Sequence, residues 1–196
     1  MRSSTKTYLL LIVIAAFAMT PAFGLPPEAT DRPSMVKNIP STWRVLSWAP
    51  PDKDGGPAEF RPANQMGEQW TQSIKIRNFS NGPFHLDEFT RGLTRFNHVE
   101  QCDYHTQSTP EAHSKNGFDS VSVVDLCGTR KGSGRGEITI YKAIAYPGWI
   151  AVGERTIKLP AFDGSKVPMS DYNIEMLRQW ADGFYLCSPG MCPAIR

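Results

Sequence analysis

Residues 120–159 read SVSVVDLCGTRKGSGRGEITIYKAIAYPGWIAVGERTIKL, and this stretch decides the fold. Three runs rich in β-branched residues, 120–127, 137–145 and 149–159, are separated by two turn segments that contain glycine. β-Branched residues favour strands, and short glycine-containing connections between such runs favour hairpins. The stretch therefore predicts an antiparallel meander of three strands.

Two further strands are predicted before the meander. Residues 42–48 have the composition of a strand. In residues 70–76, Ile74 and Ile76 alternate with polar residues, which is typical of a sheet with one wet face. Residues 50–62 contain four prolines and a Gly-Gly pair, and residues 103–118 are polar, so both segments are predicted to be loops.

Two helices complete the pattern. Apolar residues recur with helical spacing over residues 86–97, and acidic residues occupy the first turn. A second helix is predicted to begin at Ser170 as its N-cap, to run through Trp180 and to stop at Gly183 in the left-handed conformation.

The order strand, strand, helix, three strands, helix predicts an α+β fold. We expect an antiparallel sheet of about five strands with two helices on one face. Residues 41–196 are expected to form this single domain, and the proline-rich residues 25–40 an extended lead.

The N-terminus has the features of an export signal. Arg2 and Lys6 precede twelve apolar residues, 8–19, which are fewer than the roughly 20 needed to span a membrane. Small residues then allow cleavage after Ala22 or Gly24. Residues 1–24 are therefore predicted to be a signal peptide rather than a membrane anchor, and the protein to be periplasmic or secreted.

Cleavage changes the charge balance of the chain. The sequence has 21 basic and 19 acidic residues, and Arg2 and Lys6 would leave with the signal, so the mature chain has 19 of each. Nucleic-acid-binding proteins usually carry a basic excess. We therefore expect neither a nucleic-acid partner nor a stable membrane anchor after cleavage, but a protein or small molecule in the cell envelope. No cofactor is implied.

Four cysteines remain after cleavage: Cys102, Cys127, Cys187 and Cys192. In an exported protein an even number indicates disulfides, here with three possible connectivities. We favour Cys102–Cys127 and Cys187–Cys192, because a Pro-Gly turn at 189–190 would bring the second pair together. A zinc site is disfavoured, since no second closely spaced Cys/His pair completes it.

One polar cluster suggests acid–base or metal chemistry: His98, Glu100, Asp103 and His105. These are weak catalytic candidates, because junctions between helices and loops collect polar residues for solubility alone. The G-x-S-x-G motif of serine hydrolases is absent. The five tryptophans could stack on sugars, but they are interpreted as core residues.

The glycine-rich residues 128–136 suggest a second kind of site. Their backbone N–H groups could hold an anion, with charge supplied by Arg130, Lys131 and Arg135. The segment lacks the P-loop spacing and joins two strands, so an ordinary hairpin tip is the competing interpretation.

Two stretches carry a resemblance to other proteins. Residues 64–76, NQMGEQWTQSIKI, resemble the "GQ…ENWTE" segment that leads into a strand in exported bacterial α+β proteins of unknown function. Residues 136–144, GEITIYKAI, resemble the "GE…KAI" strand of the same proteins. The resemblance covers residues 40–160 and implies a Gram-negative envelope address. It supplies no site residues.

Two functional hypotheses follow. The first is an exported, disulfide-stapled accessory protein, inhibitor or binding module without enzymatic activity. The alternative is a small extracellular hydrolase or metal-dependent enzyme that uses the cluster at residues 98–105.

Overall fold

The computed structural model describes residues 33–47, 58–67, 69–80, 85–98, 100–164, 166–188 and 191–192. Within these ranges, the side chains at 80, 94–98 and 171–172 are not described. The predicted signal peptide, residues 1–24, lies outside the described residues.

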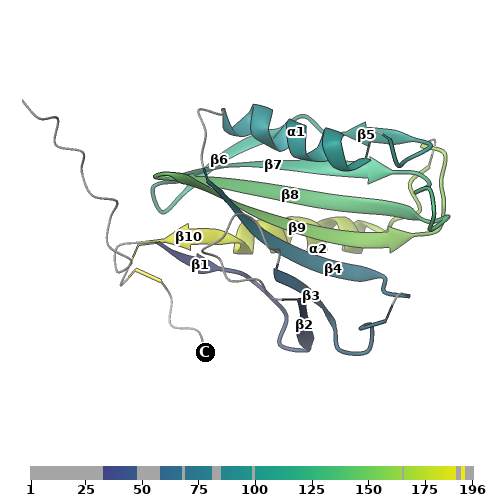
Figure 1. The fold of residues 1–196 in the computed structure, drawn as a ribbon, viewed down its shortest axis with the longest axis horizontal. Coiled ribbons are helices and arrows are strands. Elements are labelled where there is room, and N and C mark those ends of the chain that lie inside the picture. Colours follow the sequence, from purple (N-terminus) through teal and green to yellow (C-terminus); the bar gives the residue numbers. More distant parts are fainter. Residues whose placement is uncertain are drawn as a thin grey trace, which may run out of the picture.

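Strands dominate the described part of the chain, and two helices accompany them (Figure 1). The elements are β1 (Ser34–Val36), β2 (Trp43–Ser47), β3 (Ala58–Pro62), β4 (Gln72–Ser80), α1 (Leu86–His98), β5 (His105–Gln107), β6 (Glu111–Lys115), β7 (Phe118–Cys127), β8 (Gly136–Tyr146), β9 (Trp149–Leu159), α2 (Asp171–Gly183) and β10 (Tyr185–Cys187).

An antiparallel sheet of eight strands forms the body of the molecule. Its order is β2-β3-β4-β9-β8-β7-β5, and β6 pairs with the same edge of β7 as β5 does. A separate two-stranded sheet joins β1 to β10. The predicted five-stranded α+β sheet is therefore wrong: the fold is mostly β, although the predicted meander of β7, β8 and β9 is present.

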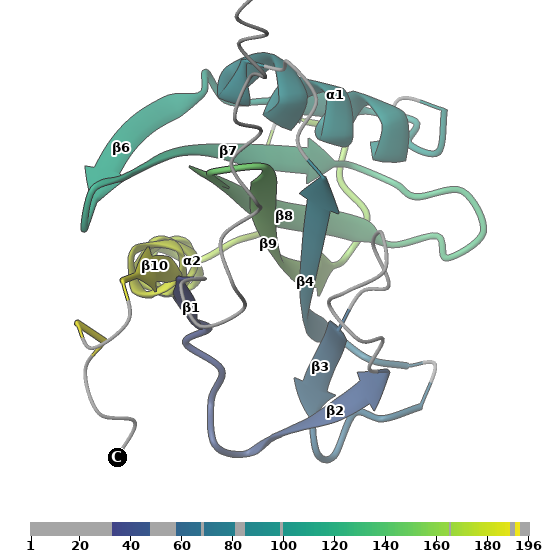
Figure 2. The same ribbon diagram turned by 60° about the vertical axis from the view of Figure 1, so that its left-hand side comes forward.

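The two helices cover opposite faces of the sheet, not one face as predicted (Figure 2). Leu177 and Trp180 of α2 pack on the inner face, against isoleucines that include Ile138 and Ile140. Helix α1 packs on the outer face, where Ala143 and Val152 belong to a second core cluster: Ala143, Ile150, Val152, Phe79, Leu86, Phe89 and Leu93. A helical apolar stripe shows that a helix buries one side, but not which face of a sheet receives it.

Three strands occupy segments that were predicted to be loops. Ala58–Pro62 form β3 within the proline-rich segment, and Pro62 is the last residue of that strand. The short strands β5 and β6 lie in the polar segment 103–118. All five side chains of β6 are exposed, so its sequence carries no apolar alternation. Its pairing with β7 rests on the backbone ladder, which sequence periodicity does not reveal.

The ends of α2 confirm one cap and correct the other. The Ser170 side chain accepts a hydrogen bond from the backbone N–H of Asn173, as expected for an N-cap. Gly183 does not adopt the left-handed stop; it is the last helical residue, and Phe184 follows in extended conformation. At Gly183 the lack of a side chain matters instead, because a Cβ would collide with the Asn38 side chain.

Two disulfides join the pairs that the sequence favours, Cys102–Cys127 and Cys187–Cys192. The second pair flanks a turn in which the N–H of Met191 donates to the carbonyl of Ser188; residues 189–190 between them lie outside the described part. Disulfides persist in oxidising compartments, so both fit an extracytoplasmic protein.

Candidate functional site

The outer face of the sheet is charged where α1 does not cover it. Because neighbouring strands are in register, polar side chains from different strands line up in rows across this face. Three rows follow from the pairing of β4, β9 and β8: Lys75, Glu154 and Tyr141; then Ser73, Thr156 and Thr139; then Lys158 and Glu137.

Apart from the buried Ser73, the residues of these rows form the floor of a cleft of about 540 Å³. Its walls come from the segment before β4, the residues after α1 and the glycine-rich connection between β7 and β8. The lining residues outside the three rows are Trp70, Arg77, Gln101, Arg130, Lys131, Gly132 and Ser133. A volume of this size is within the usual range for small-molecule sites.

Positive charge exceeds negative charge in the cleft. The five cations are Lys75, Arg77, Arg130, Lys131 and Lys158, and the two carboxylates are Glu137 and Glu154. Glu137, only 3% exposed, accepts a hydrogen bond of 2.6 Å from Arg130 Nη1. Arg77 Nε lies 3.2 Å from Glu154 Oε1, an ion pair without hydrogen-bond geometry. Each carboxylate thus fixes one arginine, and three lysines remain as the surplus.

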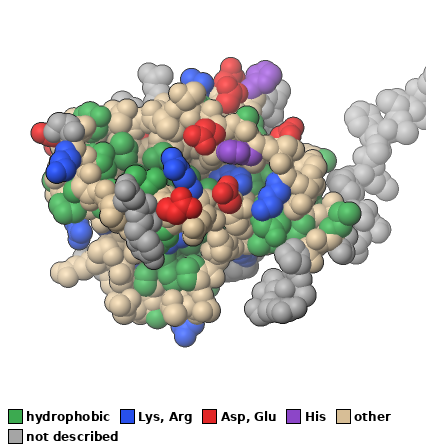
Figure 3. Space-filling model, turned by 180° about the vertical axis from the view of Figure 1, so that it is seen from behind, with side chains coloured by type: hydrophobic (Ala, Val, Ile, Leu, Met, Phe, Trp, Pro, Cys, Tyr) green, Lys and Arg blue, Asp and Glu red, His purple; other side chains and the backbone are tan. Residues whose placement is uncertain are grey.

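The opposite side of the molecule lacks such a concentration of one sign. Figure 3 shows that face with basic and acidic side chains intermingled among apolar and neutral ones. The basic surplus of the cleft is therefore a local feature in a chain whose predicted mature form is neutral.

Among the three lysines, Lys158 contacts an aromatic ring. Its ammonium lies 3.7 Å from the centre of the Trp70 ring, and the Arg61 guanidinium lies 4.8 Å from the same centre. Burial lowers the pKa of Lys158; Glu137 opposes this, while nearby arginines, Arg130 among them, lower that pKa further. An anion bound here would relieve the repulsion among these cations.

The Cys102–Cys127 disulfide supports the wall that carries Arg130. Cys102 forms an isolated β-bridge with Arg130, and Arg130 Nη2 donates to Gln101 Oε1 at 2.6 Å. The Lys131 ammonium donates to the carbonyl of Glu100. The segment after α1 and the glycine-rich connection are thus held together at the rim of the cleft.

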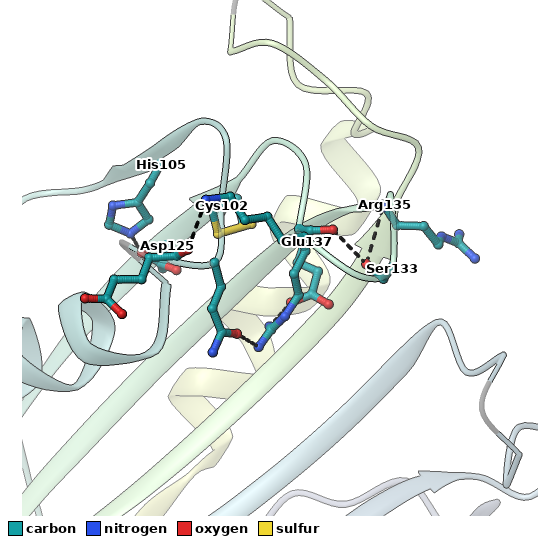
Figure 4. Close-up of a disulfide and its surroundings, with 11 residues drawn as sticks. Cys102, His105, Asp125, Ser133, Arg135 and Glu137 are labelled. Atoms are coloured by element: carbon teal, nitrogen blue, oxygen red, sulfur yellow. Dashed lines mark hydrogen bonds and ion pairs between the residues drawn. A yellow bond between two sulfur atoms is a disulfide. The ribbon is translucent and has the colours of Figure 1, made fainter.

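The predicted anion-binding trio is only partly brought together. Arg130 and Lys131 line the cleft, but Arg135 does not, and Figure 4 shows its side chain extending away from Glu137. The glycine-rich connection contributes to the cleft wall through Gly132 and Ser133.

The cluster predicted at residues 98–105 is dispersed where it is described. Glu100 and Asp103 are exposed, and the side chain of His98 lies outside the described residues. His105 Nε2 lies 2.6 Å from Oδ1 of Asp125, a fully buried carboxylate on β7 (Figure 4). Among the described residues, no group of three or more His, Cys, Asp or Glu is placed to hold a metal ion.

Sequence reasoning missed most of the cleft residues. The signal was present in the sequence. Lys75 and Arg77 alternate with Ile74 and Ile76 on β4, and Thr156 and Lys158 alternate with Ile157 and Leu159 on β9. Only the register of β4 against β9 shows that these polar faces adjoin. Trp70, interpreted as a core residue, is half-buried at the cleft.

Comparisons with known proteins give little further guidance. No protein-family model matches the chain, and comparison with curated protein sequences finds no match. Among solved structures, the chain is similar to LpqN, which is involved in cell envelope biogenesis of Mycobacterium tuberculosis. That similarity has a TM-score of 0.48 and 12% identity, over 85% of this chain and 87% of LpqN. A likeness at this level says nothing about activity.

One structural finding bears on membrane association. No helix in the described ranges combines the length and the apolar character that crossing a bilayer requires.

Proposed function

We propose that the protein is an exported binding module, periplasmic or secreted, that holds a small anionic ligand in the charged cleft. The observation that carries this proposal is the excess of five cations over two buried carboxylates in one cleft of about 540 Å³. Arg130 and Arg77 are already paired with glutamates, so they are fixed in place before a ligand arrives. Prior ordering of this kind lowers the entropic cost of binding.

Further features support both the proposed location outside the cytoplasm and the proposed binding function. Two disulfides suit an oxidising compartment, and the predicted signal peptide and the resemblance to exported bacterial proteins point to the cell envelope. The buried glutamates and the cation–ring contact of Lys158 build a rigid polar floor. Such a floor suits recognition of a small molecule of the cell envelope, and no catalytic step is needed to explain it.

The test uses the protein produced by export, so that the signal is removed and both disulfides form. Binding of citrate, inorganic phosphate and digalacturonate is measured by titration calorimetry at low salt. At least one of these anions is expected to bind. The Lys75→Ala and Lys158→Ala variants should weaken that binding about tenfold or more, because a hydrogen bond to a charged group contributes roughly 1.5–3 kcal/mol.

Lys166→Ala provides the matched control, since Lys166 is exposed and does not line the cleft. It should bind like the parent protein. Failure of all three anions to bind, or equal binding by parent and cleft variants, would contradict the proposed function.

A further inference from the structure

Two hydroxyl groups lie side by side in the middle of the cleft floor. Thr156 and Thr139 are cross-strand partners on β9 and β8, and both line the cleft. The hydroxyls of Thr139 and Thr156 are hydrogen-bonded to each other at 2.9 Å. Threonine hydroxyls both donate and accept hydrogen bonds, so this threonine pair can serve a ligand group of either kind.

The rows on either side of the hydroxyls each contain one lysine and one glutamate. Lys75 lies opposite Glu154, and Lys158 lies opposite Glu137. In a site for a simple anion the glutamates would serve only to hold Arg130 and Arg77 in place, because a nearby carboxylate repels an anion. Glu137 and Glu154 line the cleft, and a carboxylate offers about four acceptor positions to hydrogen-bond donors.

We propose that the ligand of the cleft is an acidic sugar, a hydroxyl-bearing ring compound with one or more carboxylates. This inference rests on the proposed function and narrows it. The carboxylates of the sugar pair with the lysines, and its hydroxyls donate to the glutamates and exchange hydrogen bonds with the threonine pair. A ligand with both carboxylates and hydroxyls can pair with the lysines and also with the glutamates and threonines of the floor. A ligand with only carboxylates or only hydroxyls leaves one of these sets of side chains unused.

The spacing of the rows sets the size of the ligand. Glu154, in the row of Lys75, is four residues from Lys158 along β9, so the two lysine rows are about 13 Å apart. The threonine pair lies midway between them. A disaccharide spans this distance better than a single ring, and its second carboxylate would reach the second lysine.

The experiment compares three probes by titration calorimetry on the exported, oxidised protein. Digalacturonate has both carboxylates and hydroxyls, cellobiose has hydroxyls without charge, and citrate has charge with only one hydroxyl. Digalacturonate is expected to bind at least tenfold more tightly than either of the other two.

A double variant, Thr139→Val with Thr156→Val, removes the hydroxyl pair while keeping the side-chain shapes. Replacing both partners of a hydrogen bond together leaves neither unsatisfied, and valine suits a strand. Its affinity for digalacturonate should fall about tenfold, while its affinity for citrate stays within twofold. Thr106→Val on β5 is the matched control, because Thr106 does not line the cleft; it should bind both probes like the parent.

Two results would overturn the sugar assignment and leave the proposed function standing. One is citrate binding as tightly as digalacturonate or more tightly. The other is a double variant that folds, as shown by an unchanged unfolding midpoint, and binds digalacturonate as the parent does. Failure of digalacturonate to bind would overturn the sugar assignment, and the proposed function would also be overturned if neither citrate nor inorganic phosphate bound.

Discussion

Lys142 is a charged side chain in the inner core. It is 4% exposed, and its ammonium donates a hydrogen bond of 2.7 Å to the carbonyl of Ala181 in the last turn of α2. That turn contains no basic residue of its own, and Lys115 donates to the next carbonyl, that of Asp182. Two lysines from outside the helix therefore neutralise its negative end.

The pKa of Lys142 leads to a prediction about pH. Burial lowers this pKa below 10.5 in the folded protein; Asp182 raises it, and Lys115 lowers it further. Between the folded pKa and 10.5, the unfolded chain binds more protons, so the contribution of Lys142 to stability increases as the pH rises. Lys142→Met should lack this increase. Urea unfolding of both proteins between pH 7 and 10.5 would measure the free energy of unfolding. The value for the parent minus that for Lys142→Met should increase as the pH rises, and a difference that stays constant with pH would refute the prediction.

Gly153 shows how a missing side chain allows close packing. A Cβ at this position of β9 would lie 2.8 Å from the ring of Phe184 and 2.9 Å from that of Trp180, which stack on each other at the C-terminal end of α2. Gly153→Ala should therefore destabilise the protein by about 1–3 kcal/mol through overpacking. Thermal and urea unfolding would measure the change.

Gly92→Ala serves as the counterpart, with the opposite expected sign. Gly92 lies in helix α1, is exposed and has open space around its Cα. Alanine there should stabilise the protein by about 0.5–1 kcal/mol, since it favours the helix. If both Gly153→Ala and Gly92→Ala changed the free energy of unfolding in the same direction, the explanation by overpacking at Gly153 would be contradicted.

At the scale of elements, the disulfides constrain segments of different length. Cys102–Cys127 spans 25 residues and joins the segment after α1 to the end of β7, whereas Cys187–Cys192 spans five. In the chain-entropy description, a longer closed loop removes more freedom from the unfolded chain. The first bridge also supports the cleft wall through Cys102 and Arg130.

Removing each bridge by paired Cys→Ala substitutions should therefore have unequal effects. Loss of Cys102–Cys127 should lower the free energy of unfolding by about 3.5 kcal/mol, and loss of Cys187–Cys192 by about 2 kcal/mol. Only the first loss should also weaken ligand binding in the cleft. Urea unfolding and calorimetry test both statements, and a larger stability loss from the C-terminal bridge would contradict them.

At the scale of the whole molecule, charge is distributed unevenly rather than in excess. The predicted mature chain has equal numbers of basic and acidic residues, yet the cleft collects five cations against two carboxylates. Long-range attraction of an anion to such a patch is screened by salt over about 10 Å at 0.1 M. The cleft should thus recruit anions without making the whole surface basic.

This distribution predicts a salt dependence confined to binding. Raising sodium chloride from about 20 to 200 mM should weaken anion binding several-fold, because the screening length shortens over this range. A neutral molecule of similar size should show no such change. Calorimetry at four salt concentrations would measure the slope, and a salt-independent affinity would argue against charge recognition.

Local patterns in the sequence were sufficient to predict several of the observed helices and strands. Alternation around Ile74 and Ile76 predicts β4, and the helical spacing and the Ser170 cap predict the two helices close to their observed bounds. The exposed edge strand β6 was missed because it carries no apolar pattern, and the three-residue strand β5 is too short and polar to show one. Strand β3 was missed for a different reason, since it lies in the proline-rich segment that predicted a loop.

The sequence by itself determined the β7–β8–β9 meander and the two helices, because strand and helix periods and turn residues act over a few positions. It favoured one of three cysteine pairings, and the structure has that one. Only the tertiary structure decided that α1 and α2 lie on opposite faces, and that Lys75 and Lys158 meet on one floor. These two lysines are 83 positions apart in the sequence. They come together through the register of β4 against β9, which is set by long-range pairing and burial rather than by any local pattern.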